Sequence, residues 1–213
     1  MKNKLSTLAL ALAFTPAVSF AQFSMPSIPG MGKSAAAPSA DLGGQQTQLV
    51  RAYVAANKDV LTANSKMAEA LGLKDAAVAS KATADSLTEG ATKDNLDAAN
   101  KEVSASTDAV AAELKKGPQL DAASKATFGV GLVALASGVS KYVGVGKNVS
   151  DMASGLKGAS MMQLPSLQSA VSIVSKFPDS MATVSSALKN AIAFAKSNDI
   201  PVPADATKAL AAL

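Results

Sequence analysis

Serine and lysine are the residue types in this chain that most readily suggest covalent chemistry. Two Ser-x-x-Lys tetrads occur, Ser154 to Lys157 and Ser186 to Lys189. A neighbouring base that takes the serine proton turns the hydroxyl into a nucleophile. Penicillin-recognising enzymes use such a tetrad together with Ser-Asp-Asn and Lys-Thr-Gly motifs, which this sequence lacks. Because the chain is rich in both residue types, two matches are expected by chance, and we interpret all four residues as surface residues.

The composition excludes most other catalytic and metal-binding chemistry. The 213 residues include no histidine and no cysteine. Their absence removes Ser-His-Asp and Cys-His nucleophile systems, zinc fingers and haem attachment. The aspartates are scattered without the spacing of a calcium-binding loop. We therefore predict a protein that is not an enzyme and that holds no metal and no cofactor.

Glycine motifs for phosphates and dinucleotides are incomplete. The segment Met31-Gly32-Lys33-Ser34 resembles the end of a phosphate-binding loop, but Ser27 stands where that motif needs glycine or alanine. The pairs Gly129-Val130-Gly131 and Gly144-Val145-Gly146 have neither a third glycine at the proper place nor a preceding strand. The sequence therefore does not support nucleotide binding.

The first 21 residues predict a secretory signal peptide. Lys2 and Lys4 precede an apolar run, and Ser19-Phe20-Ala21 is a small-x-small cleavage site. The run covers only about ten residues, whereas a membrane-spanning helix needs about 20. We expect cleavage after Ala21 and export, with the periplasm as the favoured location and the extracellular space as the alternative. A chain without cysteine needs no oxidative folding there.

Removal of the signal peptide changes the charge of the chain. The full sequence has a net charge of +4, and the loss of Lys2 and Lys4 lowers it to +2. The lysines are spread singly and Arg51 is the single arginine, so we expect no nucleic-acid partner. Residues 22–40 combine proline, glycine and serine without a helical period, which predicts a flexible tether before a domain at 41–213.

From residue 41 onward the sequence predicts helices alone. Alanine is the strongest helix former, and no alternating strand pattern is present. The expected helices cover about 41–71, 75–88, 92–116, 121–156, 165–177 and 179–198, with a short helix after Pro203. Phe177-Pro178 is expected to end the fifth helix, because the residue before a proline avoids helical backbone. The glycines at 144 and 146 mark a candidate bend or break in the fourth.

The segment near 121–160 has the sharpest periodicity. Its apolar residues recur in steps of four and three, the spacing of a helix stripe that packs against another helix. The stripe includes Phe128, Leu132, Leu135, Val139, Tyr142 and Gly146. We identify these six residues as a candidate interaction surface, which faces either another helix of the same chain or another copy. The oligomeric state is left open.

Residues 126–140 contain no charged side chain, which suits either a membrane-inserting element or a buried core helix. The stretch is shorter than the usual 18 residues of a membrane span, so the buried helix is favoured.

Alanine-lined helices with few aromatic side chains either pack very closely or leave a cleft that an acyl chain occupies. Close packing is the favoured alternative.

The charge of the domain is divided between its two halves. Residues 41–121 have 12 acidic and 9 basic side chains, and residues 122–213 have 4 acidic and 8 basic side chains. We expect the two halves to face each other in one molecule.

The sequence thus predicts an exported, all-α, alanine-rich multi-helix bundle around an apolar, glycine-containing helix. Its expected function is non-catalytic and depends on contacts with a protein partner or a cell-envelope component. The alternative is a membrane-active bundle, or one that binds a lipid or another apolar ligand.

Overall fold

The computed structural model describes residues 41–213, and the described chain is helical throughout. The elements are α1 (Leu42–Ala70), α2 (Lys74–Ser86), α3 (Lys93–Lys115), α4 (Ala122–Lys157), the 3-10 helix η1 (Leu164–Leu167), α5 (Gln168–Ser197) and α6 (Ala204–Ala211). Residues 41–213 contain no strand. The predicted all-α multi-helix bundle is confirmed, as is its apolar helix. The predicted signal peptide (1–21) and tether (22–40) lie outside the described residues.

Short polar side chains begin three of the long helices. Asp41 accepts a hydrogen bond from the Gly44 backbone N–H at 3.0 Å, and Asp121 accepts one from the Ser124 N–H at 2.7 Å. Thr92 and Asn95 form a reciprocal capping box at the start of α3. These bonds satisfy backbone donors that the first turn of a helix leaves unpaired. The starts of α1, α3 and α4 are therefore determined locally.

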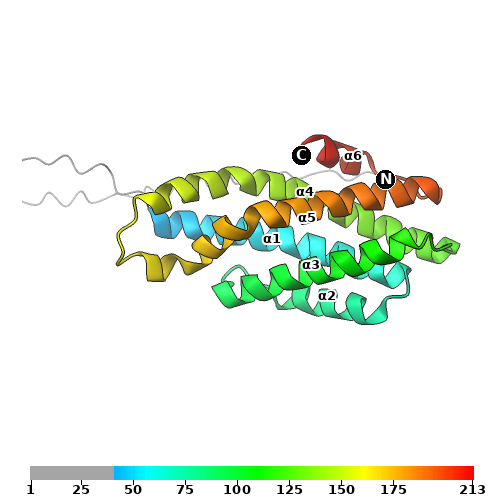
Figure 1. Cartoon of the computed structure of the whole chain (residues 1–213), viewed down its shortest axis with the longest axis horizontal. Coiled ribbons are helices and arrows are strands. Elements are labelled where there is room, and N and C mark those ends of the chain that lie inside the picture. Colours follow the sequence, from blue (N-terminus) through cyan, green and yellow to red (C-terminus); the bar gives the residue numbers. More distant parts are fainter. Residues whose placement is uncertain (1–40) are drawn as a thin grey trace, which may run out of the picture. The chain divides into compact units, whose positions relative to one another are not determined.

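α1 lies between the other long helices of the bundle. It contacts α2, α3, α4 and α5, and Figure 1 shows it running between α4 on one side and α2 and α3 on the other. α5 packs against both α3 and α4, and the short α6 packs against α4. One hydrophobic core contains residues from all six α-helices. α1 and α4 make the most extensive contact between two helices of the bundle, and each of the other α-helices packs against at least one of them.

Glycines on α4 allow that helix to lie very close to α1. A β-carbon placed on Gly138 would lie 2.7 Å from Val60 Cγ2 and 3.1 Å from the Val60 backbone nitrogen. A β-carbon on Gly131 would lie 2.9 Å from Met67 Cγ. These separations are too short for any residue but glycine unless a helix shifts. The alanine- and glycine-lined helices are thus in direct contact along this seam.

α4 is long and apolar enough to cross a membrane, and it is the one helix among residues 41–213 with that property. Half of its most apolar 18-residue stretch is buried inside the bundle. A helix in the core of a bundle that does not enter a membrane also meets these criteria of length and apolar composition.

The structure corrects the expected end of a helix at Phe177-Pro178. α5 is continuous from Gln168 to Ser197, with Pro178 in its interior. Proline removes one backbone donor, but the helix continues because both of its halves bury apolar residues in the core, among them Ile173 before the proline and Val184 after it. The glycines at 144 and 146 likewise neither break nor end α4.

Two ion pairs join the acidic and the basic parts of the domain. Lys141 of α4 lies 2.7 Å from Asp59 of α1, and Lys176 of α5 lies 2.7 Å from Asp97 of α3. The charge asymmetry of the sequence is therefore matched in part within one molecule.

Candidate binding groove

The predicted interaction stripe on α4 faces the interior of the bundle. Its five large members are fully buried: Phe128, Leu132, Leu135, Val139 and Tyr142. Phe128 packs against Phe194 of α5, and the Tyr142 ring packs against Tyr53 of α1. Gly146 is half-buried beside Phe177. The stripe thus contacts helices of the same chain, and its large side chains are covered in this fold.

An open groove of about 730 Å³ lies between α3 and the start of α5. We call it the α3–α5 groove. Its lining comes from α3, from the turn before η1, from η1 and from the first turns of α5: Lys93, Asp97, Met161, Leu164, Pro165, Gln168, Val171, Ser172, Ser175 and Lys176. Its volume lies within the range of about 300–1,000 Å³ that is typical of small-molecule sites.

Local contacts position both walls of the groove. The capping box at Thr92 determines where α3 begins and thereby orients Lys93 and Asp97, which are one turn apart. On the other wall, the Gln46 side chain donates to the Ser166 carbonyl at 3.0 Å and accepts from the Ala170 N–H at 3.2 Å. These two bonds tie η1 and the start of α5 to α1.

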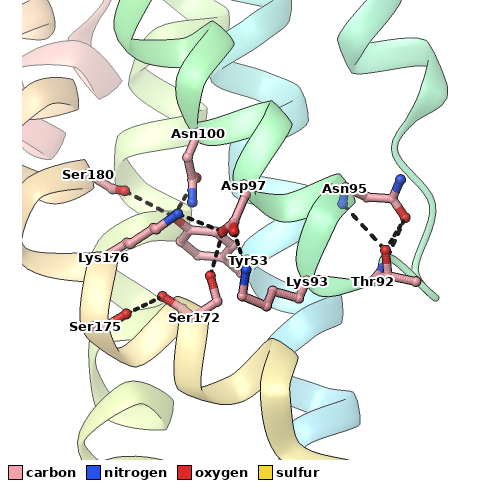
Figure 2. Close-up of polar contacts among 10 residues, drawn as sticks. All are labelled: Tyr53, Thr92, Lys93, Asn95, Asp97, Asn100, Ser172, Ser175, Lys176 and Ser180. Atoms are coloured by element: carbon pink, nitrogen blue, oxygen red, sulfur yellow. Dashed lines mark hydrogen bonds and ion pairs between the residues drawn. The ribbon is translucent and has the colours of Figure 1, made fainter.

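Asp97 is the centre of the polar part of the groove. Figure 2 shows its carboxylate reaching from α3 toward α5. The Lys176 Nζ and the Ser172 Oγ each donate to Asp97 Oδ1 at 2.7 Å. Lys93 Nζ donates to Asp97 Oδ2 at 2.7 Å. One carboxylate therefore joins two lysines and a serine, and the four residues carry a net charge of +1.

The surroundings of Asp97 hold its carboxylate ionised. Its pKa lies well below the ordinary value, because hydrogen bonds from Lys176, Lys93 and Ser172 stabilise the charged form. The pKa of Lys93 is raised by its hydrogen bond to Asp97 and by the charge of that group. The Asp97 side chain is 26% exposed, so the cluster is in contact with solvent.

This arrangement is suited to holding charge and poorly suited to transferring protons. Activation of Ser172 needs a base with a free lone pair. Both lysines instead donate to Asp97, and the lowered pKa makes that carboxylate a weak base. Ser172 is also buried, and its hydroxyl proton is engaged with Asp97.

A second polar group lies in the interior next to the Asp97 cluster. The Tyr53 hydroxyl donates to Asn100 Oδ1 at 2.7 Å and lies 3.0 Å from Ser180 Oγ, as drawn in Figure 2. Tyr142 donates to Asn57 Oδ1 at 3.0 Å, and burial raises its pKa well above the ordinary value. Within residues 41–213 the Asn100 Nδ2 is buried without a hydrogen-bond partner. These contacts join α1, α3, α4 and α5.

The rest of the groove is apolar and open to solvent. Met161 is 89% exposed and the adjacent Met162 is 92% exposed, whereas most large apolar residues among residues 41–213 are buried. Leu164 and Val171 are also exposed and line the same groove as Met161. The groove therefore combines an exposed apolar wall with a compact, positively charged cluster.

Sequence reasoning missed this groove, although two signals were present. Lys93 with Asp97, and Ser172 with Lys176, are spaced four residues apart and so lie on one helix face each. The Met161-Met162 pair lies in a turn between helices, where large apolar residues are unusual. Such spacings are common, and the sequence does not reveal that α3 and α5 lie side by side.

The other sequence motifs do not meet in a site. Both Ser-x-x-Lys tetrads lie at exposed positions: Ser154, Lys157, Ser186 and Lys189. Ser154 donates to the Ser150 carbonyl of its own helix. In the described part of the chain, no group of three acidic, histidine or cysteine residues is arranged to hold a metal ion.

Comparison of the chain with protein-family models, with curated proteins and with solved structures finds no match.

Proposed function

We propose that the protein is exported to the periplasm and acts there as a non-catalytic helical protein, through contacts with a protein or with a cell-envelope component. The α3–α5 groove is the part of the surface that makes these contacts. The signal-peptide pattern of residues 1–21 supports export.

The observation that carries this proposal is the exposed apolar wall of the groove. Met161, Leu164 and Val171 leave apolar area in water beside the Asp97 cluster. Contiguous exposed apolar area with a polar rim is characteristic of sites that bind another molecule. The flexible methionine side chain suits such a surface because it adapts to different shapes.

The non-catalytic part of the proposal is supported by the chemistry of the same groove. Its one buried hydroxyl, on Ser172, donates to a carboxylate that is a weak base. Its two ammonium groups donate to that carboxylate as well. Unlike catalysis, the binding of a ligand requires only that the two ammonium groups and the carboxylate keep their charges.

Site-specific photo-crosslinking in the producing cells tests the proposal. A benzophenone amino acid is placed at Met161, and in a matched variant at Val130, an exposed apolar position on α4 that does not line the groove. We expect a discrete adduct from position 161 and none from position 130. The adduct from position 161 is expected to disappear when Val171→Asp is added. Equal labelling at both positions, or an adduct that Val171→Asp leaves unchanged, would show that the groove is not the contact site.

The second candidate is a membrane-active bundle, and the character of α4 favours it. This helix is long and apolar enough to span a membrane, and it exposes Val130 and Val133. Liposome flotation with dye release separates the two functions. A membrane-active protein floats with the vesicles and releases their dye, whereas a groove-binding protein leaves the vesicles sealed.

A further inference from the structure

The two lysines of the charged cluster in the α3–α5 groove have ammonium N–H donors that Asp97 does not occupy and that a ligand can use. An ammonium group has three N–H donors, and Lys93 and Lys176 each use one on Asp97. Their side chains are 46% and 44% exposed, so the remaining donors are accessible from the groove. Because two ammonium groups share one carboxylate, the four residues of the cluster keep a net charge of +1. The charge of the Asp94 carboxylate also acts on Lys93, but Asp94 lines a neighbouring hollow and not this groove.

The apolar wall continues directly from this cluster. Val171 lies one residue before Ser172 on α5, and Met161, Leu164 and Pro165 line the same groove. The groove therefore offers both a cationic part and an apolar part to one bound molecule. The volume of about 730 Å³ suits one small molecule.

We propose that the α3–α5 groove binds a single-chain amphiphile with a carboxylate head, of the fatty-acid class. The head accepts hydrogen bonds from the Lys93 and Lys176 ammonium groups, which already bind a carboxylate in Asp97, and the chain lies along Met161, Leu164 and Val171. This inference rests on the proposed role of the groove as a contact site, and the ligand that it names is of the lipid class, the alternative that the sequence predicts.

Charge complementarity and tail burial make separate contributions to this binding. Removal of one ammonium weakens a charge-assisted hydrogen bond, which corresponds to about a tenfold loss of affinity. Each further methylene buried on the wall raises the affinity by up to about fourfold. The head-group preference and the chain-length dependence are therefore measurable independently.

Isothermal titration of the purified exported chain tests the proposal, with monomeric laurate as the probe. We expect saturable binding of one laurate per chain, weaker binding of decanoate and no binding of dodecyltrimethylammonium. Lys93→Gln and Lys176→Gln are each expected to lower the affinity for laurate about tenfold. Equal affinity for the anionic and the cationic amphiphile, or no dependence on chain length, would overturn the proposal.

A pair of matched variants separates groove binding from general surface adsorption. Val171→Asp places a negative charge on the exposed wall of the groove, and Val130→Asp places one at an exposed position outside it. We expect Val171→Asp to abolish laurate binding and Val130→Asp to leave it unchanged, with identical helical circular dichroism for both. Equal loss in both variants would remove the groove as the site.

Methionine methyl resonances give a second readout that does not depend on any substitution. Laurate is expected to shift the Met161 methyl signal, whereas the methyl signal of the buried Met67 stays in place. A shift at Met67 without one at Met161 would place the ligand in the core and contradict the proposal.

Failure of this inference and failure of the proposed function give different results. If laurate does not bind but the adduct from position 161 is still lost in Val171→Asp, the ligand class is wrong and the groove remains a contact site. If the chain binds anionic phospholipid vesicles but not monomeric laurate, a membrane surface replaces the fatty acid as the partner. If laurate binds and no adduct forms at position 161, the fatty-acid inference is supported. The proposed contact with a protein or a cell-envelope component is then wrong.

Discussion

Buried polar residues determine how the helices of this bundle meet. Asn64 of α1 donates to Ser106 Oγ at 2.8 Å and to Thr107 Oγ1 at 3.0 Å, both on α3. Asn57, also on α1, accepts from the Tyr142 hydroxyl of α4. A buried polar group costs free energy unless it finds its partner. Alanine-lined faces are alike at many registers, so these bonds favour one arrangement over its shifted alternatives.

Replacement of Asp97 tests the charged cluster in the free protein. A carboxylate whose pKa is lower in the folded chain stabilises the fold above its unfolded pKa of about 4, and this stabilisation is lost as the pH falls toward the folded pKa. Asp97→Asn is expected to lower the free energy of unfolding by about 1–3 kcal/mol at pH 7. The difference from wild type should shrink below about pH 4. Urea unfolding across this pH range measures it.

Asp85→Asn is the matched control for this measurement, because Asp85 pairs with Lys81 on an exposed helix surface. Such pairs contribute about 0–1 kcal/mol. A pH dependence of equal size in both variants would mean that the Asp97 contacts do not stabilise the fold.

Gly138 is expected to tolerate no side chain. Its added β-carbon would meet Val60, including the Val60 backbone nitrogen, so Gly138→Ala must push α1 and α4 apart. We expect a loss of about 1–3 kcal/mol in the free energy of unfolding. Gly144 lies on the same helix with open space around it, so Gly144→Ala is expected to stabilise the chain by about 0.5–1 kcal/mol. Thermal and urea unfolding compare the two, and a stabilised Gly138→Ala would disprove the close seam.

At the scale of elements, local signals account for where the helices begin. Thr92 accepts a hydrogen bond from the Asn95 N–H, and its own N–H donates to the Asn95 side chain at 3.1 Å. At the other ends, Gly72 and Gly117 have positive φ angles of 76° and 64°, which glycine adopts without strain. Caps and glycine stops depend on neighbours in sequence, so a sequence is enough to find them.

The cap at Thr92 is expected to stabilise both α3 and the groove. Thr92→Ala removes the side-chain acceptor and should lower the free energy of unfolding by about 1 kcal/mol. Thr92→Ser retains a hydroxyl at the same place and should remain close to wild type. Hydrogen exchange of the first α3 amides resolves the effect locally. Equal exchange in the alanine and serine variants would mean that the capping box does not hold this end of the helix.

Pro178 shows where local signals fail. A proline removes a backbone donor and crowds the preceding turn, so the sequence predicts an end of the helix there. In the structure α5 continues, with Phe177 close to the Tyr142 ring and Val184 and Leu188 buried beyond it. Tertiary packing of the two halves of α5 outweighs the free-energy cost of the proline. Because that packing involves residues distant in sequence, a local sequence pattern does not reveal it.

At the scale of the whole molecule, the processing of the full chain is the clearest prediction. The chain recovered from the periplasm by osmotic shock is expected to begin at Gln22, because Ser19-Phe20-Ala21 fits the small-x-small pattern that signal peptidases cleave. N-terminal sequencing checks this, and replacement of Ala21 by a bulky residue should leave the chain unprocessed. A released protein that begins at Met1 would rule out the signal peptide.

The amino-acid sequence by itself determined the helical class, most helix ends and the apolar character of α4. Composition, capping residues and apolar period act within a few turns, so no knowledge of the fold is needed to find them. It also identified the stripe from Phe128 to Tyr142 as a helix contact, but it did not reveal that this contact is made inside the chain.

Only the tertiary structure decided where the groove lies. Lys93 and Asp97 come from α3, whereas Ser172 and Lys176 come from a helix more than 50 residues further along the chain. Their meeting depends on how α1 holds both helices, through contacts such as that between Gln46 of α1 and the Ala170 N–H of α5. Contacts of this kind result from the packing of the entire bundle, so they cannot be inferred from the spacing of residues within any one segment.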